Sequence, residues 1–321
     1  MGKRPRTVEP PVGNPPPVEW HDLFCGGGLA AYGARAAGLA VAQGVDNDSL
    51  ALRAFARNFP EAGVLNLTLG PDSEAPWPDP TPRVHVHLSP PCGELSSAKA
   101  GPRDASGAML LRWSVEQAVA RGYSSWSVET VVSPHTKPIV ASIVKARPQH
   151  VASAQIDAAN LGSPQSRVRL VVGPPALIDR LRPATCPPRV SIRHAYEAVG
   201  LVARAPYVKN HSVPPAIRSV EDVAPTVVAS RALIWCDCNG KTVKCMGSED
   251  SRVLMGLELD YALSGTHYVD QRVLGNGLCF HVARGIARAA IELLMKNPGI
   301  GAPLSRPATS DSLNQPPLAI R

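Results

Sequence analysis

Short apolar stretches alternate with longer segments in which apolar residues recur every three or four positions. The apolar stretches predict strands, and the 3.6-residue spacing predicts helices. We expect strands at 18–24, 39–45, 64–67, 84–88, 124–128, 151–157 and 168–172, with helices between several of them, for example at 108–120 and 138–146. Strands that alternate with helices are typical of a mostly parallel sheet covered on both faces. The pattern therefore predicts an α/β fold.

The hydrophobic pattern also divides the chain. Residues 1–17 are rich in proline and basic residues and residues 297–321 in proline and serine, so we expect a disordered arm and a disordered tail. Residues 18–178 carry the strands and helices described above. Residues 179–269 have irregular spacing, which predicts a small, irregular second region. A clear helical pattern returns within 270–296, and we expect this segment to pack back on the sheet.

Composition narrows the function. Lys and Arg number 33 against 26 Asp and Glu, a formal charge of +7 that favours a polyanionic partner, although a solubilising surface charge would look the same. No apolar run approaches the ~20 residues that span a bilayer, so we expect no membrane association. Seven scattered cysteines indicate reduced thiols and an intracellular location, in the cytoplasm or nucleus. We expect a monomer.

The first predicted strand runs into Gly26-Gly27-Gly28 ahead of a helix. Glycines permit a tight turn and close approach of a ligand, and the helix N-terminus offers unpaired N–H groups to an anion. Asp46 follows the second predicted strand, where it can accept hydrogen bonds from ribose hydroxyls. Because Ala31 breaks the glycine spacing of dinucleotide binders, a nicotinamide oxidoreductase is disfavoured and a methionine-type cofactor fits.

A cysteine follows the strand predicted at 84–88, in the run Ser89-Pro90-Pro91-Cys92. Ligands of an open parallel sheet bind at the carboxyl ends of its strands. Two prolines fix the backbone ahead of the cysteine, which a cysteine that merely fills the core does not need. We therefore interpret Cys92 as a nucleophile.

Five motifs along the chain resemble, in order and spacing, those of cytosine-C5 methyltransferases. They are Asp22-Leu23-Phe24-Cys25-Gly26-Gly27-Gly28, Ser89-Pro90-Pro91-Cys92, Val128-Glu129-Thr130, Gln165-Ser166-Arg167-Val168-Arg169 and Gly275-Asn276-Gly277. The resemblance covers roughly residues 18–295. It implies a Rossmann-like class I S-adenosylmethionine-dependent methyltransferase fold, with a small, irregular target-recognition domain.

The resemblance assigns catalytic roles to four residues. Cys92 would add as a thiolate to C6 of a cytosine, so that C5 can attack the methyl group of S-adenosyl-L-methionine. Glu129 would hold the ring at N3 and the exocyclic amine. Arg167 and Arg169 would position the base oxygen and the thiolate region. Because the two arginines alternate along a predicted strand, we expect both to point to one face.

The resemblance also implies residues that bind the cofactor and DNA. The cofactor residues lie in the glycine turn, at strand ends and before the last helix: Phe24, Cys25, Gly26, Gly28, Asp46, Asn47, Asn66, Leu67 and Asn276. The residues expected to contact DNA are Ser96, Ser97, Lys99, Arg103 and Gln165. The first four belong to a loop that would close over a cytosine flipped out of double-stranded DNA.

Three positions depart from the family pattern: Gly93 stands in place of a glutamine, Thr130 in place of an asparagine and Asn66 in place of an acidic residue. The nucleophile, the glutamate and both arginines remain. We therefore expect a DNA (cytosine-5-)-methyltransferase. The alternatives are a tRNA cytosine-C5 methyltransferase, with RNA as the partner, and a catalytically weak nucleic-acid-binding paralogue.

Three cysteines in the second region, Cys236, Cys238 and Cys245, raise the question of zinc. His211 or His267 could supply a fourth ligand. Structural zinc sites more often show paired C-x2–4-C knuckles than this C-x-C spacing. We therefore favour core or hairpin cysteines and expect no metal.

Overall fold

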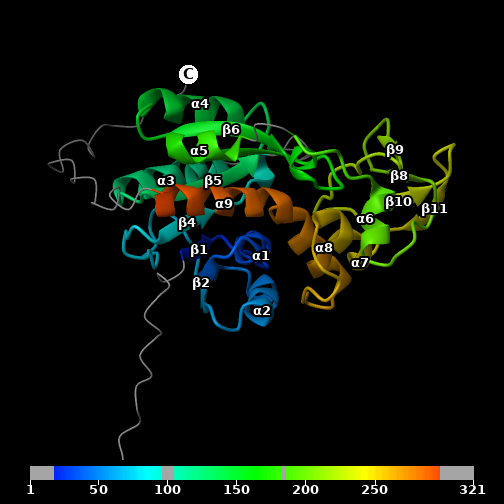
Figure 1. Cartoon of the computed structure of the whole chain (residues 1–321), viewed down its shortest axis with the longest axis horizontal. Helices are drawn as coiled ribbons and strands as arrows, with labels where there is room; N and C mark the ends of the chain where they lie inside the picture. The colour runs from blue at the N-terminus through cyan, green and yellow to red at the C-terminus, as the bar shows by residue number, and fades with distance from the viewer. Residues whose placement is uncertain (1–17, 96–104, 183–185, 297–321) are drawn as a thin grey trace, which may run out of the picture.

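A computed structural model describes residues 18–95, 105–182 and 186–296, and it is built on one seven-stranded sheet (Figure 1). The strands follow the order β3-β2-β1-β4-β5-β7-β6, and β7 runs antiparallel to both of its neighbours. Their bounds are β1 (Glu19–Leu23), β2 (Ala40–Asp46), β3 (Gly63–Asn66), β4 (Val84–Leu88), β5 (Ser125–Val131), β6 (Ala152–Asp157) and β7 (Val168–Gly173). The predicted α/β fold with a mostly parallel sheet is confirmed.

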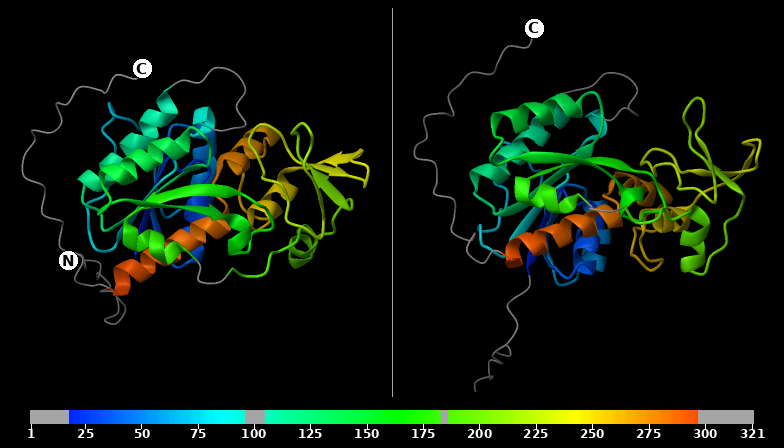
Figure 2. Two further views of the ribbon diagram at one scale, coloured as in Figure 1. Left: turned by 90° about the horizontal axis from the view of Figure 1, so that it is seen from above. Right: turned by 45° about the horizontal axis from the view of Figure 1, so that its top comes forward.

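Helices cover both faces of this sheet (Figure 2). One apolar cluster gathers α1 (Leu29–Ala36), α2 (Ser49–Asn58), α5 (Pro175–Leu181) and α9 (Phe280–Lys296). The opposite cluster gathers α3 (Ser106–Ala120) and α4 (Thr136–Ala146). The closest helix contact is between α1 and α9, where a Cβ added at Gly33 would lie 2.5 Å from the Cβ of Ala283. The last helix therefore packs directly on the first.

Residues 186–276 form a region that extends from one side of the sheet (Figure 1). It holds α6 (Ile192–Ala198) and an antiparallel sheet of order β11-β10-β8-β9, followed by α7 (Ser248–Met255) and α8 (His267–Asn276). The strands are β8 (Tyr207–Lys209), β9 (Ile217–Ser219), β10 (Ile234–Cys236) and β11 (Thr242–Cys245). This region is more regular than its sequence pattern indicates.

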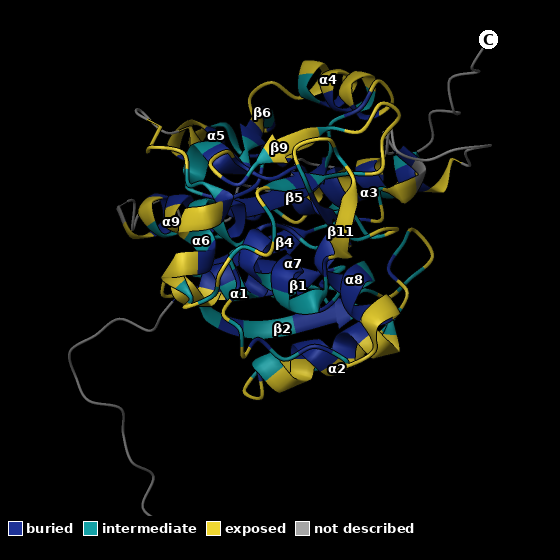
Figure 3. Cartoon of the chain, turned by 90° about the vertical axis from the view of Figure 1, so that its right-hand side faces the viewer, coloured by how far each residue is buried: buried dark blue, intermediate teal, exposed yellow. Residues whose placement is uncertain are grey.

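The second region shares its core with the seven-stranded sheet. Trp235 on β10 and Tyr196 on α6 are buried edge to face, and they belong to the same apolar cluster as α1 and α9. Viewed from this side, the strands of the large sheet form a buried centre while β9 and β11 are exposed (Figure 3). Among the described helices, none is long and apolar enough to cross a membrane.

Candidate active site

A cavity of about 350 Å³ opens at the carboxyl ends of β1, β2, β4 and β5 and is closed on one side by α8. Its walls carry a glycine turn, four acidic residues, the proline–cysteine loop and polar residues of α8. The lining residues are Asp22, Phe24, Cys25, Gly26, Gly27, Leu29, Ala30, Asp46, Asn47, Asp48, Ala51, Ser89, Pro90, Pro91, Cys92, Gly93, Glu129, Arg272, Val273, Asn276, Gly277 and Leu278. Most of the predicted cofactor residues thus meet Cys92 and Glu129 in one space.

The turn after β1 is fixed by backbone bonds to β2. The Cys25 amide donates to the Val45 carbonyl at 3.0 Å, and the Gly26 amide donates to Oδ2 of Asp46 at 2.8 Å. Phe24 has a φ of +59°, a left-handed conformation that is uncommon for a residue with a side chain. A Cβ added at Gly26 would meet nothing within 4 Å. The backbone of the turn is therefore open to a ligand in the cavity.

Two aspartates at the end of β2 extend this wall. Asp46 also accepts from the Asp48 amide at 2.9 Å, and burial raises the pKa of its carboxyl. Asp48 accepts from the Leu50 amide and so caps α2. Its other oxygen lies 2.5 Å from Arg272 of α8. The ion pair joins α8 to the edge of the sheet beside the cavity.

Asp22 lies beneath the glycine turn and is wholly buried. Among the residues that the structure describes, no donor meets either carboxyl oxygen with good hydrogen-bond geometry. Burial raises the pKa of this carboxyl to about 8, although the Trp20 indole and the Ala31 amide lie near enough to oppose the rise. Buried acceptors without donors are uncommon in folded proteins. Because Asp22 lines the cavity, a ligand with a cationic or N–H group could donate hydrogen bonds to its carboxyl oxygens.

The other half of the cavity holds Cys92. The Ser89 amide donates to the Leu23 carbonyl at 3.1 Å, which fixes the start of the loop. The Cys92 carbonyl accepts from the Leu95 amide at 3.0 Å and closes a short 3-10 turn, η1 (Gly93–Leu95), whose last side chain is buried. Burial and then the charge of Glu129 raise the pKa of the Cys92 thiol, and Arg169 opposes them.

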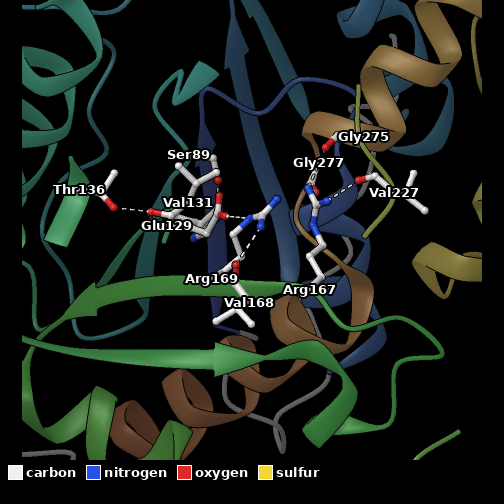
Figure 4. Close-up of polar contacts among 11 residues, drawn as sticks. Ser89, Glu129, Val131, Thr136, Arg167, Val168, Arg169, Val227, Gly275 and Gly277 are labelled. Atoms are coloured by element: carbon white, nitrogen blue, oxygen red, sulfur yellow. Dashed lines mark hydrogen bonds and ion pairs between the residues drawn. The ribbon is translucent and has the colours of Figure 1, made fainter. Parts of the chain in front are cut away.

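Glu129 and Arg169 form an ion pair at the cavity wall (Figure 4). The Nε of Arg169 lies 2.7 Å from Oε1 of Glu129, and their side chains are only 11% and 5% exposed. Antiparallel pairing explains the contact, because Val131 of β5 lies opposite Arg169 of β7 and Glu129 is two residues earlier on the same face. The guanidinium therefore fixes the orientation of the carboxylate.

Arg167 and Arg169 rise from the same side of their strand, as expected, but their guanidinium groups reach different partners (Figure 4). Arg167 lies directly before β7, and its carbonyl still accepts from the Ala158 amide at 3.1 Å. Its guanidinium is wholly buried and donates to the carbonyls of Val227, Gly275 and Gly277 at 2.6, 2.8 and 2.9 Å. Burial lowers the pKa of this guanidinium to about 9, which leaves it charged at neutral pH. Arg167 ties the second region and the end of α8 to the sheet.

Gln165, predicted to contact DNA, is also a buried connection. Its Nε2 donates to the Leu254 carbonyl at 2.7 Å, and its Oε1 accepts from the Val227 amide at 3.0 Å. The side chain is wholly buried and does not line the cavity. The other residues predicted to contact DNA, Ser96, Ser97, Lys99 and Arg103, lie outside the described residues.

Three predicted cofactor residues also lie off the cavity wall. Gly28 begins α1 with a φ of +89°, and a Cβ there would collide with Phe55 and Phe59. Asn66 ends β3 and is exposed. Leu67 packs against the cluster of α3 and α4. Gly28 is required for packing, and the other two lie beside Asp46 without reaching the cavity.

Sequence reasoning missed Arg272, although Asn276 on the same helix was found. The two residues are four apart on α8, a spacing that places them on one helical face, and both line the cavity. That spacing was the available signal. In the part of the chain that the structure describes, no group of three or more His, Cys, Asp or Glu side chains could hold a metal ion.

No family model matches the sequence, and no curated protein matches it either. Solved structures do resemble it. A protein assigned as a DNA modification methyltransferase, encoded within an E. coli prophage, matches with a TM-score of 0.63 at 15% identity, over 87% of this chain and 99% of that chain. DNMT2 of Spodoptera frugiperda, in a mutant form, matches with a TM-score of 0.58 at 13% identity, over 86% and 99%. The fold is that of class I methyltransferases. In this class I fold, the cavity lies at the carboxyl ends of the central strands, where open α/β sheets bind their ligands.

Proposed function

We propose that the chain is an S-adenosylmethionine-dependent methyltransferase that acts on C5 of a cytosine in DNA. The observation that carries the proposal is the single cavity that joins the glycine turn to Cys92 and Glu129. A candidate nucleophile and a nucleoside-type turn in one space suit group transfer to a base. The similarity of fold to methyltransferases supports the same reaction class.

The cavity fits the cofactor. The open backbone at Gly26 leaves room for the methionine end. A bound ammonium group would lower the raised pKa of Asp22 and would pair with the resulting carboxylate. Asp46 and Asn47 line the same cavity and would offer acceptors to ribose hydroxyls. When bound, S-adenosylmethionine would supply the methyl group from its sulfonium.

Cys92 acts on the base. Its thiolate forms a bond to C6 of the cytosine, and the electron pair of the C5–C6 double bond moves to C5, which becomes nucleophilic. After methylation, loss of the C5 proton to water restores that double bond as the sulfur–C6 bond breaks, and the thiolate leaves. Because burial raises the pKa of the Cys92 thiol, the thiolate needs the positive charge of Arg169 nearby.

Glu129 holds the ring while Cys92 attacks. Its carboxyl group faces the cavity and is held at Oε1 by Arg169. The remaining carboxyl oxygen is available to accept from the exocyclic amine of cytosine and, when it carries a proton, to donate to N3. Arg169 therefore serves both partners, the carboxylate and the thiol. Arg167 has its donors committed to three carbonyls and acts as a structural clamp.

DNA is the proposed substrate because the chain carries a formal charge of +7 and one of the similar structures is assigned as a DNA modification enzyme. The test is transfer of labelled methyl from S-adenosylmethionine to unmethylated mixed-sequence DNA and, in parallel, to tRNA. Cys92→Ala removes the nucleophile, and Cys186→Ala removes an exposed cysteine that does not line the cavity, as a matched control.

Label at 5-methylcytosine in DNA, abolished by Cys92→Ala and retained by Cys186→Ala, is the expected result. Label in tRNA alone would replace DNA by RNA as the substrate. Cofactor binding without label in either nucleic acid would refute the proposed reaction and support a nucleic-acid-binding paralogue.

A further inference from the structure

Two histidines of β4, His85 and His87, are wholly buried beneath α9 and take no part in the proposed reaction. Each lies between two serine hydroxyls. His85 bonds Ser125 at 2.7 Å through Nδ1 and Ser127 at 2.9 Å through Nε2. His87 bonds Ser127 at 2.8 Å through Nδ1 and Ser89 at 2.9 Å through Nε2. Together they form one unbranched chain, Ser125–His85–Ser127–His87–Ser89, which we call the serine–histidine chain.

The two imidazoles of the serine–histidine chain are neutral. Burial lowers the pKa of His87 to about 3 and that of His85 well below its ordinary value. Trp20 of β1 stacks on both imidazoles, at 4.6 and 5.0 Å between ring centroids. Asp22 lies opposite His87 in the strand register, but burial raises its pKa to about 8, so it is largely protonated at neutral pH. All four ring nitrogens already meet a hydroxyl, which leaves none for a metal ion.

A count of protons shows how the hydrogen bonds of the serine–histidine chain can be oriented. Three hydroxyls and two neutral imidazoles carry five N–H or O–H protons, whereas four hydrogen bonds use four. One proton is left over: on Ser125, on Ser127 if that hydroxyl accepts from both rings, or on Ser89. The Ser127 arrangement leaves an unpaired proton on a wholly buried hydroxyl, which carries a desolvation penalty. If it is on Ser125, each group donates away from the cavity. If it is on Ser89, each group donates toward Ser89, and the Ser89 hydroxyl is free to donate further.

The two ends differ in their surroundings. Ser125 is wholly buried at the start of β5, where an unpaired hydroxyl proton carries a desolvation penalty. Ser89 is only partly buried and lines the cavity together with Cys92 and Glu129. Water or an acceptor in the cavity can therefore take the Ser89 proton, which favours the direction toward Ser89.

The strand register identifies the acceptor. Parallel pairing sets His87 beside Ser127 and Leu88 beside Val128, so the next residues, Ser89 and Glu129, leave neighbouring strands side by side. Ser89 continues the face of His85 and His87, and Glu129 continues the face of Ser125 and Ser127. Figure 4 shows Ser89 next to Glu129 at the wall of the cavity. The Glu129 carboxylate is thus placed to accept a hydrogen bond from Ser89 at the end of the serine–histidine chain.

We propose that the serine–histidine chain fixes Ser89 as a hydrogen-bond donor to Glu129, so that His87 is a positioning residue for the base-binding carboxylate. Arg169 holds the carboxylate from β7, and Ser89 holds it from β4. The proposal about orientation is independent of the reaction, and its kinetic consequence rests on the proposed methyl transfer.

The orientation is tested by nitrogen-15 NMR of the histidine side chains in the full chain, with signals assigned through single substitutions. Donation toward Ser89 requires the Nε2–H tautomer at both His85 and His87, unchanged from pH 5 to 9. An Nδ1–H tautomer at either ring, or titration to imidazolium in this range, would overturn the proposal. This result does not depend on any methyltransferase activity.

The positioning role is tested with two matched substitutions of His87. Gln places its amide near the Nε2 position and can reach Ser89, whereas Asn places it near the Nδ1 position and reaches Ser127. We expect His87→Asn and Ser89→Ala to slow single-turnover methyl transfer about tenfold, the equivalent of one hydrogen bond to a charged group. His87→Gln should stay much closer to the wild type.

Cofactor affinity serves as the control, because an intact fold should keep it unchanged in all three variants. We expect the double variant His87→Asn/Ser89→Ala to be no slower than either single variant, since both break the same link. Equal losses in His87→Gln and His87→Asn, or a wild-type rate in Ser89→Ala, would refute the positioning role. Wild-type protein that transfers no methyl group would refute the proposed function, and the NMR result would still decide the orientation.

Discussion

Substitution of Arg167 separates a structural clamp from a catalytic arginine. Arg167→Lys keeps the charge but replaces a fork that serves three carbonyls on two segments by one ammonium nitrogen. That nitrogen can serve either Val227 or the pair Gly275 and Gly277. One or two carbonyls then stay buried without a donor, at a cost of about 1–3 kcal/mol each. We expect Arg167→Lys to lower the free energy of unfolding by about 2–4 kcal/mol, a large fraction of the ~5–15 kcal/mol of a typical domain.

Arg169→Lys is the matched control, because it makes the same chemical change two residues away. A lysine there can still lie beside Glu129 at the cavity wall, so we expect a loss of stability below about 1 kcal/mol. Its methyl-transfer rate should nevertheless fall, since the orientation of the carboxylate is lost. Urea unfolding followed by tryptophan fluorescence measures stability in both variants, and single-turnover methyl transfer measures activity.

The clamp interpretation would be refuted if Arg167→Lys unfolds at the same urea concentration as the wild type while losing as much activity as Arg169→Lys. That combination would mean that the Arg167 guanidinium acts on the substrate. A destabilised Arg167→Lys variant whose folded fraction transfers methyl groups at nearly the wild-type rate would establish the clamp.

Three further predictions concern the thiol, the helix contact and the buried carboxyl. Glu129→Gln should speed alkylation of Cys92 by iodoacetamide at pH 8, because the Glu129 charge raises the pKa of that thiol. The rate measured for Cys92→Ser is subtracted to remove the contribution of the other cysteines. An unchanged alkylation rate in Glu129→Gln would contradict this prediction. Gly33→Ala should cost about 1–3 kcal/mol in urea unfolding, because its Cβ would lie 2.8 Å from the Arg284 amide nitrogen, whereas Gly63→Ala, with no contact closer than 3.6 Å, should have little effect. Asp22 binds a proton more tightly in the folded than in the unfolded state, so the stability it contributes falls as pH rises from its ordinary pKa of 3.8 to about 8. Asp22→Asn should therefore flatten the dependence of the free energy of unfolding on pH between pH 5 and 8. An identical slope in the variant and the wild type would refute this prediction.

Local pattern predicted the strands well. The strand predicted at 84–88 coincides with β4, and the one at 168–172 ends one residue short of β7. Pattern could not predict that β7 runs antiparallel between β5 and β6, because pairing depends on contacts between distant segments. For the same reason the small sheet of β8 to β11, with strands of three or four residues, gives no periodic signal.

The candidate site divides in the same way. Cys92, Glu129 and the glycine turn stand at strand ends, where sequence position already fixes the location. The buried contacts of Arg167 and Gln165 could not be predicted, because their partners, such as Val227 and Leu254, are 60 or more residues away and only the fold brings them together. Asp22 was overlooked as a site residue because burial beneath the turn cannot be inferred from neighbouring residues.

The packing of α9 against α1 has a consequence for biosynthesis. The helix that covers His85 and Trp20 comprises residues 280–296, so it leaves the ribosome long after the strands it covers. Until then, one face of the nascent sheet presents its apolar side chains and its serine–histidine chain to water. Chains that end before residue 280 would retain that exposed face and should be targets for chaperones and aggregation. Helix α1 can therefore reach its final packing only after residues 280–296 have left the ribosome.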